Sequence, residues 1–240
     1  LRYSHVAEFF NSLGFDVRGY DQRGFGRSEG KKSFLNYDNV LLDDLRDVFD
    51  SYAEERKNMG DGHKPLVLGH SMGGCVVAGA VTGGLIHPRG MILSSPGLIP
   101  RLTGTQKFIL KILTSVAPDL GFPGGLPLNR LTHDKNIIKK VITDPYCHGI
   151  VTARIIKFMI VTGAKAIKDA KKVSIPVLML VSGNDYLVEP AGSVSFHNNL
   201  VTEPASIRVY PELYHELFNE LPAEREKIFN DLQKWMEKLM

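Results

Sequence analysis

Apolar and polar residues follow each other along the chain in blocks that predict strands separated by helices. Apolar positions recur at helical spacing over residues 37–57 and in a C-terminal stretch from about Pro222. Between such stretches lie short runs rich in apolar residues, which are typical of parallel strands buried on both faces. The predicted strands are residues 15–21, 65–69, 90–95, 175–183 and 205–211. Because helices separate them, we expect right-handed crossovers and a mainly parallel sheet flanked by helices, which is an α/β fold.

The first residues of the chain are also predicted to form a helix. In LRYSHVAEFFNSLG, the apolar side chains of Val6, Phe9, Phe10 and Leu13 recur at helical spacing, and Gly14 is a natural C-terminal stop. This amphipathic pattern is not that of a signal peptide. Because such a helix should follow a strand, we expect that N-terminal strands of the sheet precede Leu1 and are missing from this chain.

The alternation of strands and helices stops between Pro96 and Lys172. The patterns there are helical and unusually apolar, as in QKFILKILTSVAP, DKNIIKKVI and VTARIIKFMIVTGA. A structureless loop of this length would be unusual in a compact domain. We therefore predict one core domain, made of residues 1–96 and 173–240, with an inserted helical cap. The name cap is used below for residues 97–172.

Composition and charge exclude several functional classes. The net charge is only +3 and the basic residues are scattered, which argues against a nucleic-acid partner. No apolar stretch reaches the roughly 18 residues that a membrane span needs. Two distant cysteines, Cys75 and Cys147, make neither a disulfide framework nor a zinc pattern. They favour a reducing, cytoplasmic compartment, and the sequence leaves the oligomeric state open.

The motif VLGHSMGG, residues 67–74, is the strongest candidate for chemistry. It places Ser71 between an apolar strand and a helix of small residues, which is the context of a nucleophile elbow. Gly69 and Gly73 are expected to leave room for the sharp turn. The N-terminus of the following helix offers free N–H groups to an oxyanion, and the backbone N–H of Met72 is the natural donor.

A serine nucleophile needs a base and an acid that orients the base. Asp185 follows the apolar strand at 175–183, and His215 follows the last strand. The carboxyl ends of parallel strands meet at one edge of a sheet, so both side chains should lie near Ser71. The chain order Ser, Asp, His is the one that this architecture uses. The sequence therefore predicts a catalytic triad that requires no metal or cofactor.

Each of these residues also has a simpler interpretation. Asp185 fits a turn or a helix cap, and His215 fits a solvated loop histidine. Glu216 suggests zinc, but H-E-x-x-H fails because residue 219 is Asn219. The string GFGRSEG misses the dinucleotide pattern G-x-G-x-x-G by one position. We expect His70 to be a packing or hydrogen-bonding neighbour of the serine, and Cys75 to be a small core residue.

Taken together, the motifs resemble the monoacylglycerol lipase and lysophospholipase group of α/β-hydrolases over nearly the whole chain. The matching strings are YDQRGFGRSEG, GHSMGG, LSSPGL, DPYCHG, GNDYLVEP and YHELFNE. The resemblance implies Ser71 as nucleophile, Asp185 as orienting acid and His215 as general base and then general acid. It also implies the N–H of Met72 as one oxyanion donor, with a second donor in a His-Gly motif upstream of Leu1.

The resemblance implies a serine hydrolase that cleaves carboxyl esters of single-chain lipids, either monoacylglycerols or lysophospholipids. The apolar face of the first cap helix, with Ile109 and Ile112, is expected to bind the acyl chain. Its face with Lys107 and Lys111 could contact an anionic membrane surface, or could simply be solvated while the helix packs on the core. Three alternatives stay open: a soluble carboxylesterase or thioesterase, a peptidase, and a catalytically weak fragment that binds a ligand.

Overall fold

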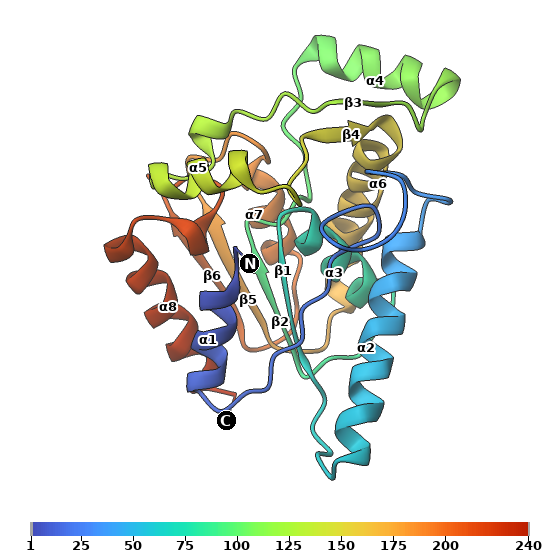
Figure 1. The fold of residues 1–240 in the computed structure, drawn as a ribbon. Helices are drawn as coiled ribbons and strands as arrows, with labels where there is room; N and C mark the ends of the chain where they lie inside the picture. Colours follow the sequence, from blue (N-terminus) through green and yellow to red (C-terminus); the bar gives the residue numbers. More distant parts are fainter. Residues whose placement is uncertain (1, 240) are drawn as a thin grey trace.

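Four of the predicted strands form one parallel sheet in the computed structural model, which describes residues 2–239 (Figure 1). The strands are β1 (Leu66–His70), β2 (Gly90–Ser94), β5 (Val177–Ser182) and β6 (Ala205–Tyr210). They pair in the order β1-β2-β5-β6, with Leu68 opposite Ile92 and Ile92 opposite Leu178. All of these pairings are parallel, so the carboxyl ends of the strands meet at one edge.

Helices cover both faces of this sheet. The helices α1 (Ser4–Ser12) and α8 (Pro222–Met236) pack on one face. The other face carries α2 (Val40–Asn58), α3 (Met72–Thr82), α6 (Ala153–Asp169) and α7 (Pro190–Asn198). In Figure 1, α1 and α8 stand to the left of the strands, and α2 and α3 stand to the right. The sheet is therefore the middle layer of three.

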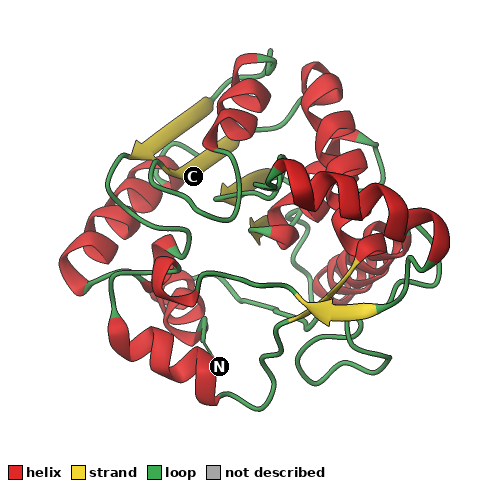
Figure 2. Cartoon of the chain, turned by 90° about the horizontal axis from the view of Figure 1, so that it is seen from above, coloured by secondary structure: helices red, strands yellow, loops and turns green. Residues whose placement is uncertain are grey.

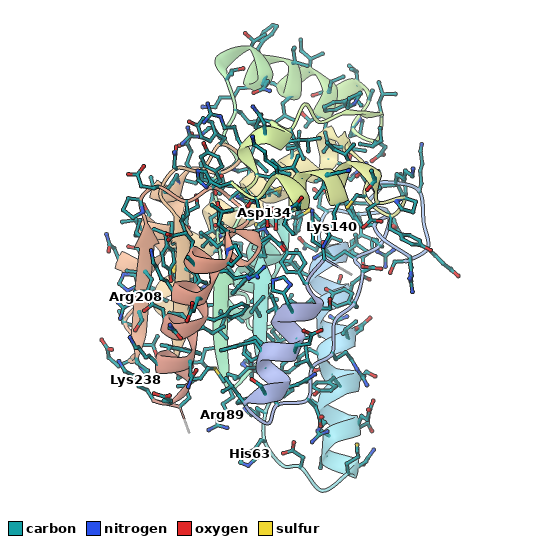
Figure 3. The ribbon with its side chains drawn as sticks, turned by 60° about the vertical axis from the view of Figure 1, so that its left-hand side comes forward. His63, Arg89, Asp134, Lys140, Arg208 and Lys238 are labelled. Atoms are coloured by element: carbon teal, nitrogen blue, oxygen red, sulfur yellow. The ribbon has the colours of Figure 1, made fainter. Side chains whose placement is uncertain are left out.

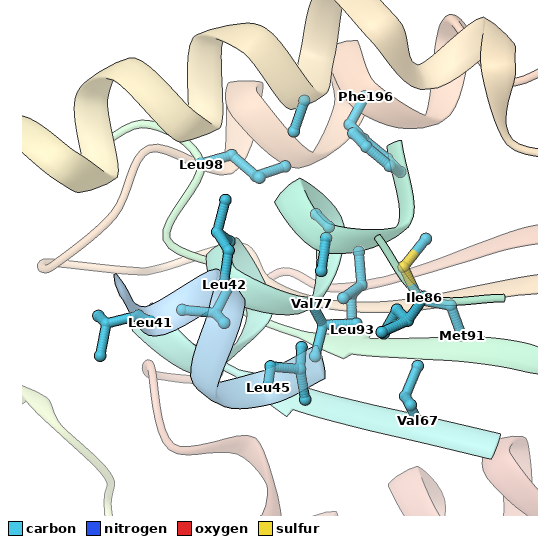
Figure 4. Close-up of a cluster of buried hydrophobic side chains, with 14 of the residues drawn as sticks. Leu41, Leu42, Leu45, Val67, Val77, Ile86, Met91, Leu93, Leu98 and Phe196 are labelled. Carbon is cyan, nitrogen blue, oxygen red and sulfur yellow. The ribbon is translucent and has the colours of Figure 1, made fainter. Parts of the chain in front are cut away.

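Side chains that alternate along each strand supply the two cores. Along β2, Met91 and Leu93 face the cluster under α2 and α3, whereas Ile92 faces the cluster under α1 and α8. Figure 4 shows Met91 and Leu93 beside Val67 of β1 and Val77 of α3. The central strands β2 and β5 are buried at every position, so they must be apolar at nearly every position, whereas the edge strand β6 is partly exposed. This requirement explains why the short apolar runs predicted them.

The cap contains short elements above the carboxyl edge of the sheet (Figure 1). These are α4 (Gly104–Val116), β3 (Gly121–Pro123), the 3₁₀ turn η1 (Leu128–Arg130), α5 (Lys135–Thr143) and β4 (Ile150–Thr152). They are followed by α6 and by the 3₁₀ turn η2 (Ala170–Lys172), and a third such turn, η3 (Leu217–Asn219), lies near the C-terminus. In the view from above, the narrow β3–β4 ribbon runs beside the cap helices (Figure 2). In Figure 3, Asp134 and Lys140 lie at the cap end, and His63 and Arg89 lie toward the opposite end.

The helix α6 packs on the core although it belongs to the range predicted as cap. A Cβ added at Gly163 would lie 2.0 Å from the carbonyl oxygen of Leu98, and one added at Gly79 of α3 would lie 2.4 Å from Thr162. The small residues therefore allow α6 to lie directly against α3 and the chain after β2. The limits of the cap at 97 and 172 stay a prediction.

The strand predicted at residues 15–21 is wrong. These residues form an extended, mostly exposed segment without strand pairing. It runs along α2, where Arg18 pairs with Glu55 at 2.6 Å and the hydroxyl of Tyr52 donates to the carbonyl of Asp16 at 3.1 Å. A strand requires backbone hydrogen bonds to a neighbouring strand, and within residues 2–239 none lies beside this segment.

The structure also contains a short ribbon of two strands. The antiparallel strands β3 and β4 have three residues each, which is too short for a recognisable alternation, and they were not predicted. Among the described residues, the helices are too short or too polar to cross a membrane.

Candidate active site

Ser71 lies at a sharp turn between the end of β1 and the start of α3. Its backbone has φ 53° and ψ −122°, a conformation that residues other than glycine rarely adopt. Hydrogen bonds hold the turn: Ser71 N–H donates to the carbonyl of Ser94 at 3.0 Å, and its own carbonyl accepts from Gly97 N–H at 2.7 Å. The strain is therefore supported by β2 and by the chain that follows β2.

Glycines near Ser71 allow the close approach of strand and helix. A Cβ added at Gly69 would lie 2.6 Å from the carbonyl oxygen of Gly73, and one added at Gly74 would lie 2.8 Å from the side chain of Pro96. At Gly73 the nearest atom would be the amide nitrogen of Gln22, at 4.0 Å. Gly69 is required as expected, whereas the second required glycine is Gly74 and not Gly73.

Asp185 lies in the turn after β5 and is 2% exposed. Its Oδ1 accepts backbone hydrogen bonds from Leu187 at 2.8 Å and Val188 at 3.0 Å, and its Oδ2 lies 2.7 Å from Nδ1 of His215. Burial raises the pKa of the Asp185 carboxyl, but the hydrogen bond and electrostatic attraction of His215 and the two backbone hydrogen bonds outweigh burial and hold the pKa below its usual value. The carboxylate is therefore ionised and fixed in orientation.

His215 lies in the loop after β6 and connects Asp185 to Ser71. The Nδ1–H donates to Asp185, so Nε2 is free to accept from the hydroxyl of Ser71, 2.8 Å away. The loop is anchored on both sides: the hydroxyl of Ser182 donates to the carbonyl of Leu213 at 2.6 Å, and Glu216 N–H donates to the carbonyl of Leu131 in the cap at 2.8 Å. The structure thus brings together all three residues of the predicted triad.

Met72 is the first residue of α3, and its N–H belongs to the first turn, whose N–H groups have no partner within the helix. This position beside Ser71 suits the donor role predicted for it. Ile109 and Ile112 lie on α4, and each is 47% exposed. A surface pocket of about 320 Å³ is lined by the end of α3, the loop that follows it, α6 and the chain before β5, and the triad is not among the lining residues.

A second polar cluster, beside the triad, was not predicted. Glu216 is 5% exposed, and its Oε2 accepts from the hydroxyl of Tyr3 at 2.5 Å and from the amide of Asn219 at 2.8 Å. Its Oε1 lies 3.5 Å from Arg2 and 3.7 Å from Nε2 of His70. The signal in the sequence is the string HELFNE, which places Glu216 directly after His215.

The charge state of this cluster follows from its contacts. Burial raises the pKa of the Glu216 carboxyl, but His70, Arg2 and Tyr3 beside it outweigh burial and hold the pKa well below its usual value. Burial and the nearby Glu216 raise the pKa of the Tyr3 hydroxyl well above its usual value. Glu216 is therefore a carboxylate that accepts a hydrogen bond from a neutral Tyr3.

Comparisons with known proteins agree with this geometry. The family model described as serine aminopeptidase, S33, matches residues 1–222. The chain is 31% identical to the monoacylglycerol lipase of Mycolicibacterium smegmatis, over 98% of this chain and 82% of that protein. The crystal structure of the Paleococcus ferrophilus monoacylglycerol lipase superposes with a TM-score of 0.86 at 27% identity, covering 100% of this chain and 90% of that one.

A third relative was solved with a substrate analogue bound. It is a soluble variant of the Saccharomyces cerevisiae monoglyceride lipase, with a TM-score of 0.81 and 26% identity, covering 92% of this chain and 76% of that one. The fold, the elbow at Ser71 and the match over residues 1–222 lead to the same assignment. The chain belongs to the serine aminopeptidase S33 family, within the monoacylglycerol lipase group of the α/β-hydrolases.

Proposed function

We propose that the chain is a serine hydrolase that cleaves carboxyl esters of single-chain lipids, with monoacylglycerols as the main class. The observation that carries this proposal is the unbroken chain of contacts from Asp185 through His215 to Ser71, at 2.7 and 2.8 Å, on a strained elbow. Nucleophile, base and orienting acid in this geometry are the requirements of acyl transfer. The names of the relatives supply the substrate class.

The first half of the reaction forms an acyl-enzyme. Ser71 Oγ attacks the ester carbonyl carbon while its proton passes to Nε2 of His215. Asp185 accepts from Nδ1–H and stabilises the imidazolium that forms. The oxyanion of the tetrahedral intermediate accepts from the N–H of Met72. When the carbon–oxygen bond breaks, His215 returns the proton to the departing glycerol oxygen.

The second half releases the fatty acid. Water enters the position that the alcohol has left and gives a proton to Nε2 of His215 as its oxygen attacks the acyl carbon. The bond to Ser71 Oγ then breaks, and His215 returns the proton to the serine. Every proton that is moved passes through His215, so the contact between Ser71 and His215 is used in both halves.

The cap supplies the proposed site for the acyl chain and the contact with lipid. Ile109 and Ile112 on α4 would line the path of the acyl chain above the sheet edge. Phe108 and Val116, 66% and 72% exposed, belong to the same apolar face as Ile109 and Ile112, and the opposite face with Lys107 and Lys111 would contact an anionic lipid surface. Both cysteines are free thiols, which supports a cytoplasmic location.

The test measures hydrolysis by the purified protein of a monoacylglycerol series, lysophosphatidylcholine, p-nitrophenyl esters and an amino-acid p-nitroanilide. We expect monoacylglycerols to be the best substrates and the anilide to be the poorest. Ser71→Ala should lower kcat by at least about 10³-fold and abolish labelling by a fluorophosphonate. The matched control is Ser51→Ala, which changes an exposed serine on α2 and should retain both activities.

Two outcomes would contradict the proposal. Labelling that persists in Ser71→Ala would mean that another residue is the nucleophile. Turnover of the p-nitroanilide above that of the monoacylglycerols would mean that the protein is a peptidase.

A further inference from the structure

Beside the triad lies a second pair made of a carboxylate and an imidazole, Glu216 and His70. These residues are the sequence neighbours of His215 and Ser71, respectively. The ring of His70 lies 4.9 Å from the ring of His215 between centroids, at an angle of 51°. His215 therefore has a ring contact with His70 in addition to its hydrogen bond to Asp185.

The hydrogen-bond partners of His70 define its orientation. Its Nδ1 lies 3.1 Å from the carbonyl oxygen and 3.2 Å from the hydroxyl of Ser94, so Nδ1 can donate to the carbonyl or accept from the hydroxyl. Its Nε2 is buried without a hydrogen-bond partner within residues 2–239 and faces Oε1 of Glu216 at 3.7 Å. One side of the ring is thus held by β2, and the other is directed toward a charge.

Glu216 is fixed more firmly than His70. Tyr3 and Asn219 hold its Oε2 at 2.5 and 2.8 Å, and its backbone N–H donates to Leu131 in the cap. An ionised carboxylate that is 5% exposed keeps a strong field because water does not screen it. When Nδ1 accepts from the Ser94 hydroxyl, the hydrogen lies on Nε2, and the field at Oε1 favours the His70 ring orientation in which this N–H points toward it.

We propose that Glu216 is a positioning residue that acts through His70. The carboxylate orients the His70 ring, and that ring packs against His215 and restricts its rotation about the hydrogen bond to Asp185. His215 Nε2 then stays within reach of Ser71 Oγ. This inference rests on the proposed function only in taking His215 as the base that activates Ser71.

The first variant is Glu216→Gln, which keeps the shape of the side chain and removes its charge. The wild type and the variant are compared on p-nitrophenyl acetate and in the rate of acylation by a fluorophosphonate. We expect kcat and the acylation rate to fall about tenfold, with KM changed less than twofold, since loss of alignment affects the reacting geometry and not substrate binding. Tyr3→Phe removes one hydrogen bond and keeps the charge, and it should lose about threefold.

A double-mutant cycle tests whether the effect passes through His70. His70→Asn keeps a polar side chain with a hydrogen-bond donor, and it removes the ring that contacts His215. We expect Glu216→Gln to have less than a twofold effect in the His70→Asn background. If the two losses multiply, Glu216 acts independently of His70 and the proposal is wrong.

A matched pair elsewhere controls for general loss of stability. The hydroxyl of Tyr210 on β6 donates to Asp231 on α8 at 3.0 Å, away from the triad. Asp231→Asn removes a carboxylate from a tyrosine just as Glu216→Gln does. We expect Asp231→Asn to change the melting temperature without a change in kcat. A fall in kcat equal to that of Glu216→Gln would show that the loss of any tyrosine–carboxylate pair lowers kcat, and that Glu216 has no specific role.

These assays need no lipid, so an error in the substrate class leaves the test intact. If the wild type does not acylate at all, the proposed function fails, and ¹⁵N NMR of the histidine rings still decides the inference. We expect the ring signals of both His70 and His215 to shift in Glu216→Gln. A His215 signal that stays unchanged would overturn the inference.

Discussion

The three triad side chains come from three different loops, and backbone hydrogen bonds fix each of them. Asp185 is held by two N–H groups of its own turn, Ser71 by β2, and the His215 loop by Ser182 and the cap. Backbone bonds of this kind leave the side chains little freedom, so the pairing at 2.7 and 2.8 Å costs little ordering when substrate binds. The alignment of these residues is a property of the folded chain.

The ionised Asp185 leads to a prediction about stability and pH. Its pKa is lowered in the folded chain, so it contributes stability that is fully present above its unfolded pKa, about 3.9. That contribution is lost as the pH falls through the folded value. Asp185→Asn should therefore destabilise the protein most at neutral pH, and the difference from the wild type should shrink below about pH 4. Urea unfolding of both proteins at several pH values measures this, and a constant difference would contradict it.

At the scale of elements, the elbow depends on how closely α3 follows β1. The close contacts at Gly69 and Gly74 involve backbone and proline atoms, which cannot move aside as a flexible side chain can. The helix α3, which packs on the sheet, thus starts directly after Ser71.

A comparison of two glycines tests this contact. Gly69→Ala should destabilise the protein by about 1–3 kcal/mol, because the added methyl group meets the backbone of Gly73. Gly73→Ala meets nothing closer than 4.0 Å and should change stability by less than about 1 kcal/mol. Thermal unfolding of the two variants provides the measurement. Equal losses of stability in the two variants would mean that the turn requires the backbone flexibility of glycine, and that steric contact with an added methyl group is not the cause.

The first cap helix supports a prediction about chain-length preference. The double variant Ile109→Ser, Ile112→Ser should reduce kcat/KM for long-chain esters about tenfold more than for acetyl esters. The reason is that only a long acyl chain would contact these two side chains and lose that apolar contact. Ile142→Ser on α5, a residue that is 63% exposed, is the control and should affect both ester classes equally. An equal loss on long and short esters in the double variant would exclude these residues from the acyl site.

At the scale of the whole molecule, stability should differ between the sheet and the segment at residues 15–22. The strand β5 is buried and pairs with β2 and β6, whereas residues 15–22 are mostly exposed and lack strand partners. Hydrogen exchange should therefore be fast over residues 15–22 and slowest in β5. Protection of the segment equal to that of β5 would show that it pairs with a strand in solution.

Sequence reasoning succeeded where one local pattern determines the structure. The buried strands, the long helices and the elbow each carry their signal within a few residues, and the triad followed from where strands end. The strand at 15–21 failed because a strand depends on a neighbour that local sequence does not reveal. Glu216 was missed because its partner Tyr3 is 213 residues away, and only the fold brings them together.

The histidine loop is attached to the cap as firmly as to the core. Leu131 accepts from Glu216 N–H, the hydroxyl of Thr132 donates to the carbonyl of Asn219, and His133 contacts Glu220 at 3.1 Å. A change in residues 131–133 would therefore alter the support of the His215 loop. A chimaera that exchanges the whole cap with that of a relative would also exchange the support of its base, whereas one that exchanges α4 alone would keep residues 131–133 and the rate of the chemical step.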